Sequence, residues 1–184
     1  MRTTTKALLA ASALCLSGCW TPKAALESFP PMHPHWQVFS APQARHSVDF
    51  PGHSKESLKE TKVSGQTVAT YLREVEVGGG YYGTAWTLVP GDTASQATRD
   101  RILEIAAAEA VNSAGGKLVW KHSVTLEGNR GLAYVIDLPQ GGMRLRQQLY
   151  VVTGMLVEQT YTGPAGTEEE RDAGRFFNSL QLLP

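Results

Sequence analysis

The strongest constraint on the fold of this chain is a series of strand-like segments between residues 117 and 163. Four segments are rich in β-branched and aromatic residues, and short turn-forming stretches separate them: KLVWKHSVTL, GLAYVIDL, MRLRQQLYVV and MLVEQTYTG. Thr153-Gly154 is a two-residue connection, and residues 139–142 form a four-residue one. Connections this short join antiparallel neighbours. The segments therefore predict an antiparallel meander of four strands.

The meander also predicts which residues face each other. If Leu138 lies opposite Met143, then Asp137 lies beside Arg144 on the neighbouring strand, where opposite charges form a cross-strand ion pair. The segment GLAYVIDL is apolar on both of its faces. Such a pattern is typical of a strand that is covered above and below, so we expect this strand in the interior of the sheet.

Further strands are expected on the amino-terminal side of the meander. HSVDFPG places Val48 and Phe50 on one face of a short strand, and QTVATYLREVEV and YYGTAWTLV read as a long hairpin around a glycine turn. The polar run over residues 53–65 is predicted to be a loop. At the other end of the chain, LQLLP is expected to form a short closing strand.

Two segments predict helices. Residues 95–113 are rich in helix formers and follow two possible N-cap residues, Thr93 and Ser95. The second helix is expected to begin with the capping box Thr167 to Glu170 and to run to about Asn178. The order of strands, helix, meander and helix predicts an α+β sandwich, in which helices flank a central antiparallel sheet of about six to seven strands.

The amino-terminal residues have the order of an export signal. Arg2 and Lys6 precede an apolar stretch over residues 7–16, and two small residues follow it. The stretch is shorter than the roughly 20 apolar residues of a membrane-spanning helix. It ends in LSGC, which resembles the lipobox of bacterial lipoproteins, in which the cysteine, here Cys19, receives a diacylglyceryl group and the signal is removed. The alternative is an ordinary signal peptide with a chance cysteine.

This interpretation divides the chain into three parts. Residues 1–18 are a lipoprotein signal peptide, residues 19–35 are the lipidated cysteine with a proline-rich tether, and residues 36–184 are a single domain. Cys15 would leave with the signal and Cys19 would be consumed by lipid, so no thiol would remain for a disulfide, a metal or a nucleophile. The membrane, reached through the lipid, is the first predicted partner.

Several phrases in the domain resemble one known group of proteins. VDFPG, LEGNRGLAYVIDL, RLRQQLYVVTGMLVEQTYTG and AGRFFNSLQL are similar, in that order, to the Mog1/PsbP-like family of exported bacterial lipoproteins, a domain of unknown function. The resemblance covers roughly residues 38–182. It implies a central antiparallel sheet flanked by helices, and a non-catalytic binding or assembly role. The group has no shared catalytic set, so the resemblance transfers no active-site residue.

The composition and motifs exclude several functions. The chain carries 17 Lys and Arg against 17 Asp and Glu without a basic cluster, so nucleic acid is not an expected partner. No G-x-S-x-G, H-E-x-x-H, calcium-loop or G-x-x-x-x-G-K-[ST] motif is present. His33 and His35 in the tether are two possible metal ligands without a third. We therefore predict no catalytic residue, no cofactor and no metal site.

Five residues are candidates for a binding surface. His122 is expected on the apolar side of the sheet, where it could act as a base or ligand or be a satisfied histidine of the core or its rim. Arg144 and Arg146 could hold an anion on the sheet surface or form a solvated face with the Asp137 pair. Tyr81 and Tyr82 follow the glycine turn, and one or the other is expected to be exposed at the edge of the hairpin.

The favoured function is a lipid-anchored, non-catalytic binding or assembly module with a protein partner in the bacterial cell envelope. If the source has an outer membrane, Trp20 after the cysteine favours sorting to that membrane, facing the periplasm, as the lipoprotein resemblance implies. Two alternatives are a carrier of a small ligand, which needs a deep apolar pocket, and a hydrolase or metal-dependent enzyme that uses His122.

Overall fold

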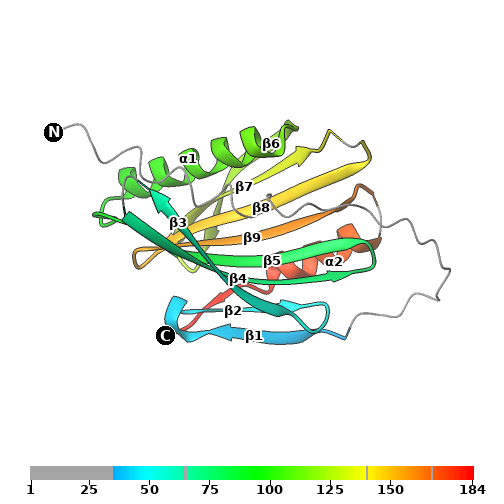
Figure 1. The fold of residues 1–184 in the computed structure, drawn as a ribbon, viewed down its shortest axis with the longest axis horizontal. Helices are drawn as coiled ribbons and strands as arrows, with labels where there is room; N and C mark the ends of the chain where they lie inside the picture. The colour runs from blue at the N-terminus through cyan, green and yellow to red at the C-terminus, as the bar shows by residue number, and fades with distance from the viewer. Residues whose placement is uncertain (1–34, 64–65, 140, 167) are drawn as a thin grey trace.

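The computed structural model describes residues 35–63, 66–139, 141–166 and 168–184 (Figure 1). The signal segment, Cys19 and His33 lie outside these residues. In chain order the described elements are β1 (Gln37–Ala41), the 3-10 turn η2 (Pro42–Ala44), β2 (His46–Phe50), β3 (Lys55–Val63), β4 (Gln66–Val77), β5 (Gly80–Leu88), α1 (Gln96–Ala114), β6 (Lys117–Leu126), β7 (Asn129–Asp137), β8 (Met143–Val152), β9 (Met155–Pro164), α2 (Glu168–Asn178) and β10 (Gln181–Leu182).

The strands form two sheets. The larger is a seven-stranded antiparallel sheet in the order β3-β4-β5-β9-β8-β7-β6, and the smaller has three strands in the order β1-β2-β10. Figure 1 shows α1 running along the β6–β8 side of the large sheet, with the small sheet at the opposite margin. The predicted seven-strand sheet with flanking helices is therefore present, but the expected short strands at residues 46–50 and 181–182 belong to a second sheet.

The predicted meander is confirmed strand by strand. β6, β7, β8 and β9 pair in sequence order, and Asp137 lies opposite Arg144. The amide of Leu138 donates to the carbonyl of Met143 at 3.0 Å and closes the turn. β7 is an interior strand, as its apolar sequence predicted. At the next turn, Thr153 and Gly154 both have positive φ values, 47° and 82°, which is the conformation that a tight two-residue hairpin needs.

The prediction of a loop over residues 53–65 was wrong. Residues 55–63 form β3, which pairs with β4 along its whole length and ends the large sheet. Its sequence, KESLKETKV, lacks the apolar run of a buried strand because an edge strand over solvent carries charges on both faces. The polar composition therefore gave no sequence signal for this strand, which is stabilised by its backbone hydrogen bonds to β4. The strand β1 over residues 37–41 was also missed.

Both helices lie where the sequence places them. Ser95 caps α1 by accepting a hydrogen bond from the amide of Thr98 at 3.0 Å, and Gly115 ends the helix in the left-handed conformation with φ 59°. Helix α2 ends at Asn178, as expected. The predicted capping box of this helix lies outside the described residues, because it depends on Thr167.

Each face of the large sheet has its own apolar core, and we name each face after the helix that covers it. On the α1 face, aliphatic side chains of β7 and β8 pack against small residues of the helix, including Leu132, Ile136, Leu145, Ala106 and Ala110. On the α2 face, aromatic side chains dominate a core shared with α2 and the small sheet, including Phe50, Tyr82, Trp86, Tyr161 and Phe176. Both Phe176 and Phe177 of α2 are buried there.

Candidate binding face

Three of the predicted candidates meet on one part of the α2 face. In the sheet register, Trp120 lies beside Val135 and Val135 beside Arg146, while His122 lies beside Ala133. Helix α2 packs mainly on β2, β5 and β9, so this part of the sheet lies to one side of the helix. We call it the β6–β8 face and define it by Trp120, His122, Arg144, Arg146 and Gln148 above the small residues Ala133 and Val135.

An aromatic pair forms one border of the β6–β8 face. Trp120 and His122 share a face of β6 because they are two positions apart in a strand. Their ring centroids lie 4.6 Å apart with an angle of 21° between the planes. His122 is exposed and Trp120 half-buried. His122 lies on the apolar side of the sheet, as the alternation predicted, but on the edge strand, where no described element covers it.

Two arginines form the other border. The Nε of Arg144 donates to Oδ1 of Asp137 at 3.1 Å, which confirms the predicted cross-strand pair. The guanidinium of Arg146 lies over the ring of Phe177, 4.5 Å from its centroid, so this cation is held against the aromatic core of the α2 face. The β6–β8 face thus presents aromatic rings and guanidinium groups, the side chains that dominate protein–protein interfaces.

The two tyrosines do not join the other candidates. The hydroxyl of Tyr81 donates to Oε2 of Glu74 at 3.0 Å on the α1 face. Tyr82 is 1% exposed and packs between Tyr161 and Phe176 in the core, so of the two tyrosines only Tyr81 reaches the surface. Successive residues of a strand point to opposite faces, and the second tyrosine of the pair therefore points into the aromatic core.

The sequence reasoning missed a buried polar cluster on the α1 face. The hydroxyl of Tyr134 donates to Oε1 of Gln147. The amide of Gln147 in turn donates to Thr160 Oγ1 at 2.8 Å and to Glu158 Oε2 at 3.1 Å. All four side chains are at least 97% buried. The signal was present in the strands themselves, because Gln147 and Glu158 occupy inward positions in segments that are otherwise apolar.

Glu158 is the most perturbed titratable group of this cluster. It is 1% exposed, and burial raises the pKa of its carboxyl from 4.5 to about 8. The carboxyl is therefore protonated at neutral pH. Oε2 accepts from Gln147, and Oε1 has no partner among the described residues.

A second buried titratable group lies on the α2 face. His46 is fully buried in β2, where Nδ1 donates to the carbonyl of Ala44 at 3.4 Å and Nε2 has no partner among the described residues. Its ring meets Trp86 edge-on at 5.3 Å. Burial lowers the pKa of His46, and the bond to Ala44 opposes this only in part. The imidazole is therefore neutral at neutral pH.

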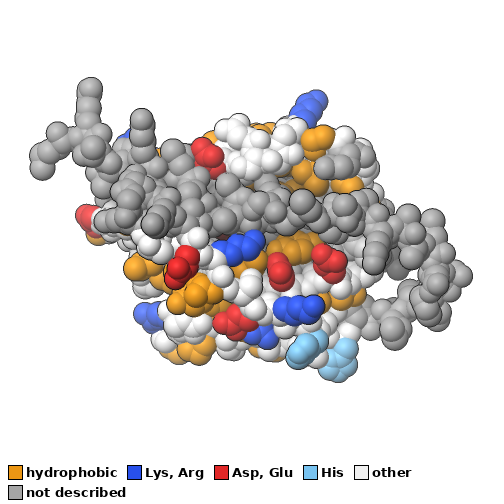
Figure 2. Space-filling view, in the orientation of Figure 1, with side chains coloured by type: hydrophobic (Ala, Val, Ile, Leu, Met, Phe, Trp, Pro, Cys, Tyr) orange, Lys and Arg blue, Asp and Glu red, His pale blue; other side chains and the backbone are white. Residues whose placement is uncertain are grey.

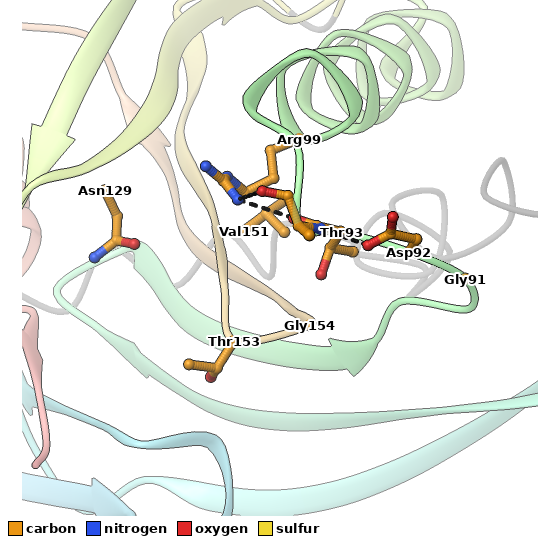
Figure 3. A pocket seen from close by; sticks show the side chains of 9 residues that line it. Gly91, Asp92, Thr93, Arg99, Asn129, Val151, Thr153 and Gly154 are labelled. Atoms are coloured by element: carbon orange, nitrogen blue, oxygen red, sulfur yellow. Dashed lines mark hydrogen bonds between the residues drawn. The ribbon is translucent and has the colours of Figure 1, made fainter.

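A pocket of about 410 Å³ lies at the opposite end of β8 from the β6–β8 face (Figure 3). The loop between β5 and α1, the turn after β8, Arg99 and Asn129 line it. Arg99 donates to the carbonyls of Thr93 and Ala94 at 2.9 and 2.7 Å, so its guanidinium closes the loop. The lining mixes polar side chains with glycine, alanine and valine, unlike the deep apolar pocket that a carrier of apolar ligands needs.

Two features are absent from the described residues. They contain no group of three or more His, Cys, Asp or Glu side chains arranged to hold a metal ion. None of their helices combines the length and the apolar character that crossing a membrane requires.

Comparisons with known proteins show the fold. No family model matches the chain, and no curated protein matches it in sequence. The solution structure of cyanobacterial PsbP (CyanoP) from Synechocystis sp. PCC 6803 is similar, with a TM-score of 0.56 and 11% identity over 84% of this chain and 96% of that one. A protein of unknown function from Pseudomonas aeruginosa matches with a TM-score of 0.36 and 11% identity over 76% of this chain and 90% of that one. The chain has a PsbP-like fold.

Proposed function

We propose that this protein is a lipid-anchored module of the bacterial cell envelope that binds or assembles with an envelope protein and does not catalyse a reaction. The observation that carries the proposal is the β6–β8 face, where the exposed ring of His122 stacks on Trp120 beside Arg144 and Arg146. At protein interfaces, buried tryptophan, tyrosine and arginine side chains contribute much of the binding energy. A partner that covered this face would find such anchors already ordered.

The anchor and the family are part of the same proposal. The LSGC sequence at Cys19 supports lipidation, and the PsbP-like fold supports membership of the Mog1/PsbP-like lipoproteins, whose motifs the sequence resembles. Two or three acyl chains hold a protein on a membrane far longer than one chain does. If the source has an outer membrane, the domain would face the periplasm from that membrane.

Photo-crosslinking in intact cells tests the binding face. We would place a photoreactive amino acid at His122, and a matched one at Ala108, an exposed position of α1. A discrete crosslinked product is expected from position 122 and not from position 108, and Trp120→Ala should abolish it. Equal products from both positions, or none from either, would contradict the proposed face. Turnover of a substrate by the protein, lost in His122→Ala, would instead support an enzyme.

Fractionation tests the anchor separately. The wild-type protein should sediment with membranes, and Cys19→Ser should either release it or leave the signal uncleaved. Cys15→Ser is the matched control, because that cysteine precedes the cleavage site and should leave the attachment unchanged. A wild-type protein that is soluble after cell disruption would overturn lipidation and leave the binding face to be judged by crosslinking.

A further inference from the structure

The outer edge of β6 is an open sheet edge. β6 is the last strand of the seven-stranded order, and no strand among the described residues lies beyond it. Its outward row of backbone N–H and C=O groups therefore has no ladder partner there, and such a row is a template for another extended chain. Residues 117–126 make it a long edge of ten residues.

The bulge in β6 confines the regular part of this edge. The register with β7 shifts between Leu118 and Trp120, so Val119 is the extra residue. From residue 120 to residue 126 the ladder with β7 is unbroken. A bulge and edge lysines discourage unspecific pairing, which leaves one defined stretch of seven residues where a strand can add in register.

The charges of β6 favour one kind of occupant. Lys117, Lys121 and His122 lie within the strand, and it contains no Asp or Glu. The other edge strand, β3, alternates both signs, with Lys55, Glu56, Lys59 and Glu60. Pairing with a second copy of β6 would bring further lysines and no carboxylate to this edge, and adding like charge to a paired strand is unfavourable. An acidic strand has no such cost.

We propose that residues 120–126 of β6 form a strand-acceptor site that takes an extended acidic segment of the partner protein as an eighth strand. This inference rests on the proposed function and names the chemistry of the partner. Because side chains of a strand alternate, one row of the added segment would meet the Trp120 and His122 rings. The other row would meet Lys121 on the α1 face.

Lys121 is the residue that would pair with the acidic side chains of the added strand. Its Nζ now donates to Oε2 of Glu104 in α1 at 2.6 Å, and both side chains are exposed, at 36% and 56%. An exposed pair of this kind contributes well under about 1 kcal/mol. A carboxylate on an added strand can therefore replace Glu104 as the acceptor with little loss, whereas an added lysine would meet repulsion.

Two synthetic peptides and the full chain test the site. One peptide alternates valine with glutamate over about eight residues, and the other alternates valine with lysine. The glutamate peptide should bind and slow amide hydrogen exchange in residues 120–126 but not in β3. The lysine peptide should bind at least about tenfold more weakly. Equal binding of both peptides, or protection elsewhere, would overturn the site.

Charge reversal sharpens the test. Lys121→Glu should reverse the preference between the two peptides, and Lys55→Glu on β3 is the matched control that should leave it unchanged. If Lys121→Glu keeps the wild-type preference for the glutamate peptide, the proposed strand-acceptor site is wrong. It is also wrong if amide exchange in β6 slows with rising protein concentration alone, because a second copy of the chain would then be the occupant. If position 122 still gives the crosslink in cells but neither peptide slows amide exchange in β6, the β6–β8 face remains the proposed binding face and strand addition is rejected.

Discussion

The two faces of the large sheet solve the same packing problem with different side chains. The α1 face packs aliphatic residues against the alanines of a long helix, and the α2 face packs aromatic rings against a short helix and a second sheet. Each face also buries a titratable side chain with one atom that finds no hydrogen-bond partner among the described residues, Glu158 on the α1 face and His46 on the α2 face. The two groups respond to pH in opposite directions.

The sign of each response follows from the direction of the pKa shift. Glu158 has a folded pKa of about 8 against an ordinary 4.5, so its contribution to stability is complete below pH 4.5 and is lost as the pH rises toward 8. His46 has a lowered pKa, so its contribution is complete above pH 6.5 and is lost as the pH falls below that value. High pH therefore weakens the α1 face and low pH weakens the α2 face.

Truncating a core side chain on each face should give the largest effects. Phe176→Ala removes a fully buried ring that contacts Phe50, Tyr82 and Phe177, and we expect it to cost about 3–5 kcal/mol of unfolding free energy. Ile102→Ala on α1 should cost less, near the lower end of about 2–5 kcal/mol. Urea denaturation at one pH measures both. A larger loss from Ile102→Ala would reverse the ranking of the faces.

Glu158→Gln should remove the sensitivity of the α1 face to high pH. Between pH 5 and pH 8 the wild-type chain should lose about 3 kcal/mol relative to this variant, because each pH unit contributes up to about 1.4 kcal/mol until the pH nears the folded pKa of about 8. Urea denaturation of both proteins across the window measures the difference. Glu104→Gln, on an exposed side chain of α1, should keep the wild-type pH profile. A Glu158→Gln protein with the wild-type slope would show that Glu158 is ionised when folded.

His46→Gln should act at the other end of the pH scale and more weakly. Below pH 6.5 the variant should be more stable to acid than the wild type. In the wild type, protonation of His46 favours the unfolded chain, because burial disfavours the charged imidazole in the folded one. Thermal unfolding at pH 5 and pH 7 gives the comparison, with the exposed His122→Gln as the control. If His46→Gln leaves the acid response unchanged, the acid sensitivity of the α2 face has another source.

Asp137→Asn should have the smallest effect. The carboxylate is 50% exposed and its partner Arg144 is 31% exposed, so the pair at 3.1 Å is worth well under about 1 kcal/mol. We expect a change in unfolding free energy of about 0.5 kcal/mol or less, which high salt should erase. A loss above 1 kcal/mol would mean that Asp137 also orders the turn between β7 and β8.

The sequence predicted the parts of the fold whose pattern is local. The meander, the two ends of α1, the carboxyl end of α2 and the Asp137–Arg144 pair follow from turn lengths, caps and alternation. It did not predict β3, because an edge strand with charges on both faces resembles a loop. It also could not separate residues 46–50 from the large sheet, because strand composition does not state which sheet a strand joins.

The candidate site was only partly predictable for a related reason. Arg144, Arg146 and His122 were identified singly, and the register of three strands brought them to one face. The part played by Trp120 emerged only with its ring beside His122. Glu158 was passed over because alternation places a residue on a face but does not reveal how deeply the face is covered, and depth of cover sets its pKa.

The small sheet depends on the last residues of the described chain, so it forms later than the large sheet when the chain is delivered from its amino terminus. β10 pairs with β2, and the amide of Leu183 donates to the carbonyl of Arg45 at 2.8 Å, across a separation of 138 positions. The seven-stranded sheet forms largely from neighbours in sequence, whereas this contact joins segments far apart in the chain. A chain that is delivered from its amino terminus onward can thus build its large sheet early. Its small sheet is completed only when residues 181–183 arrive.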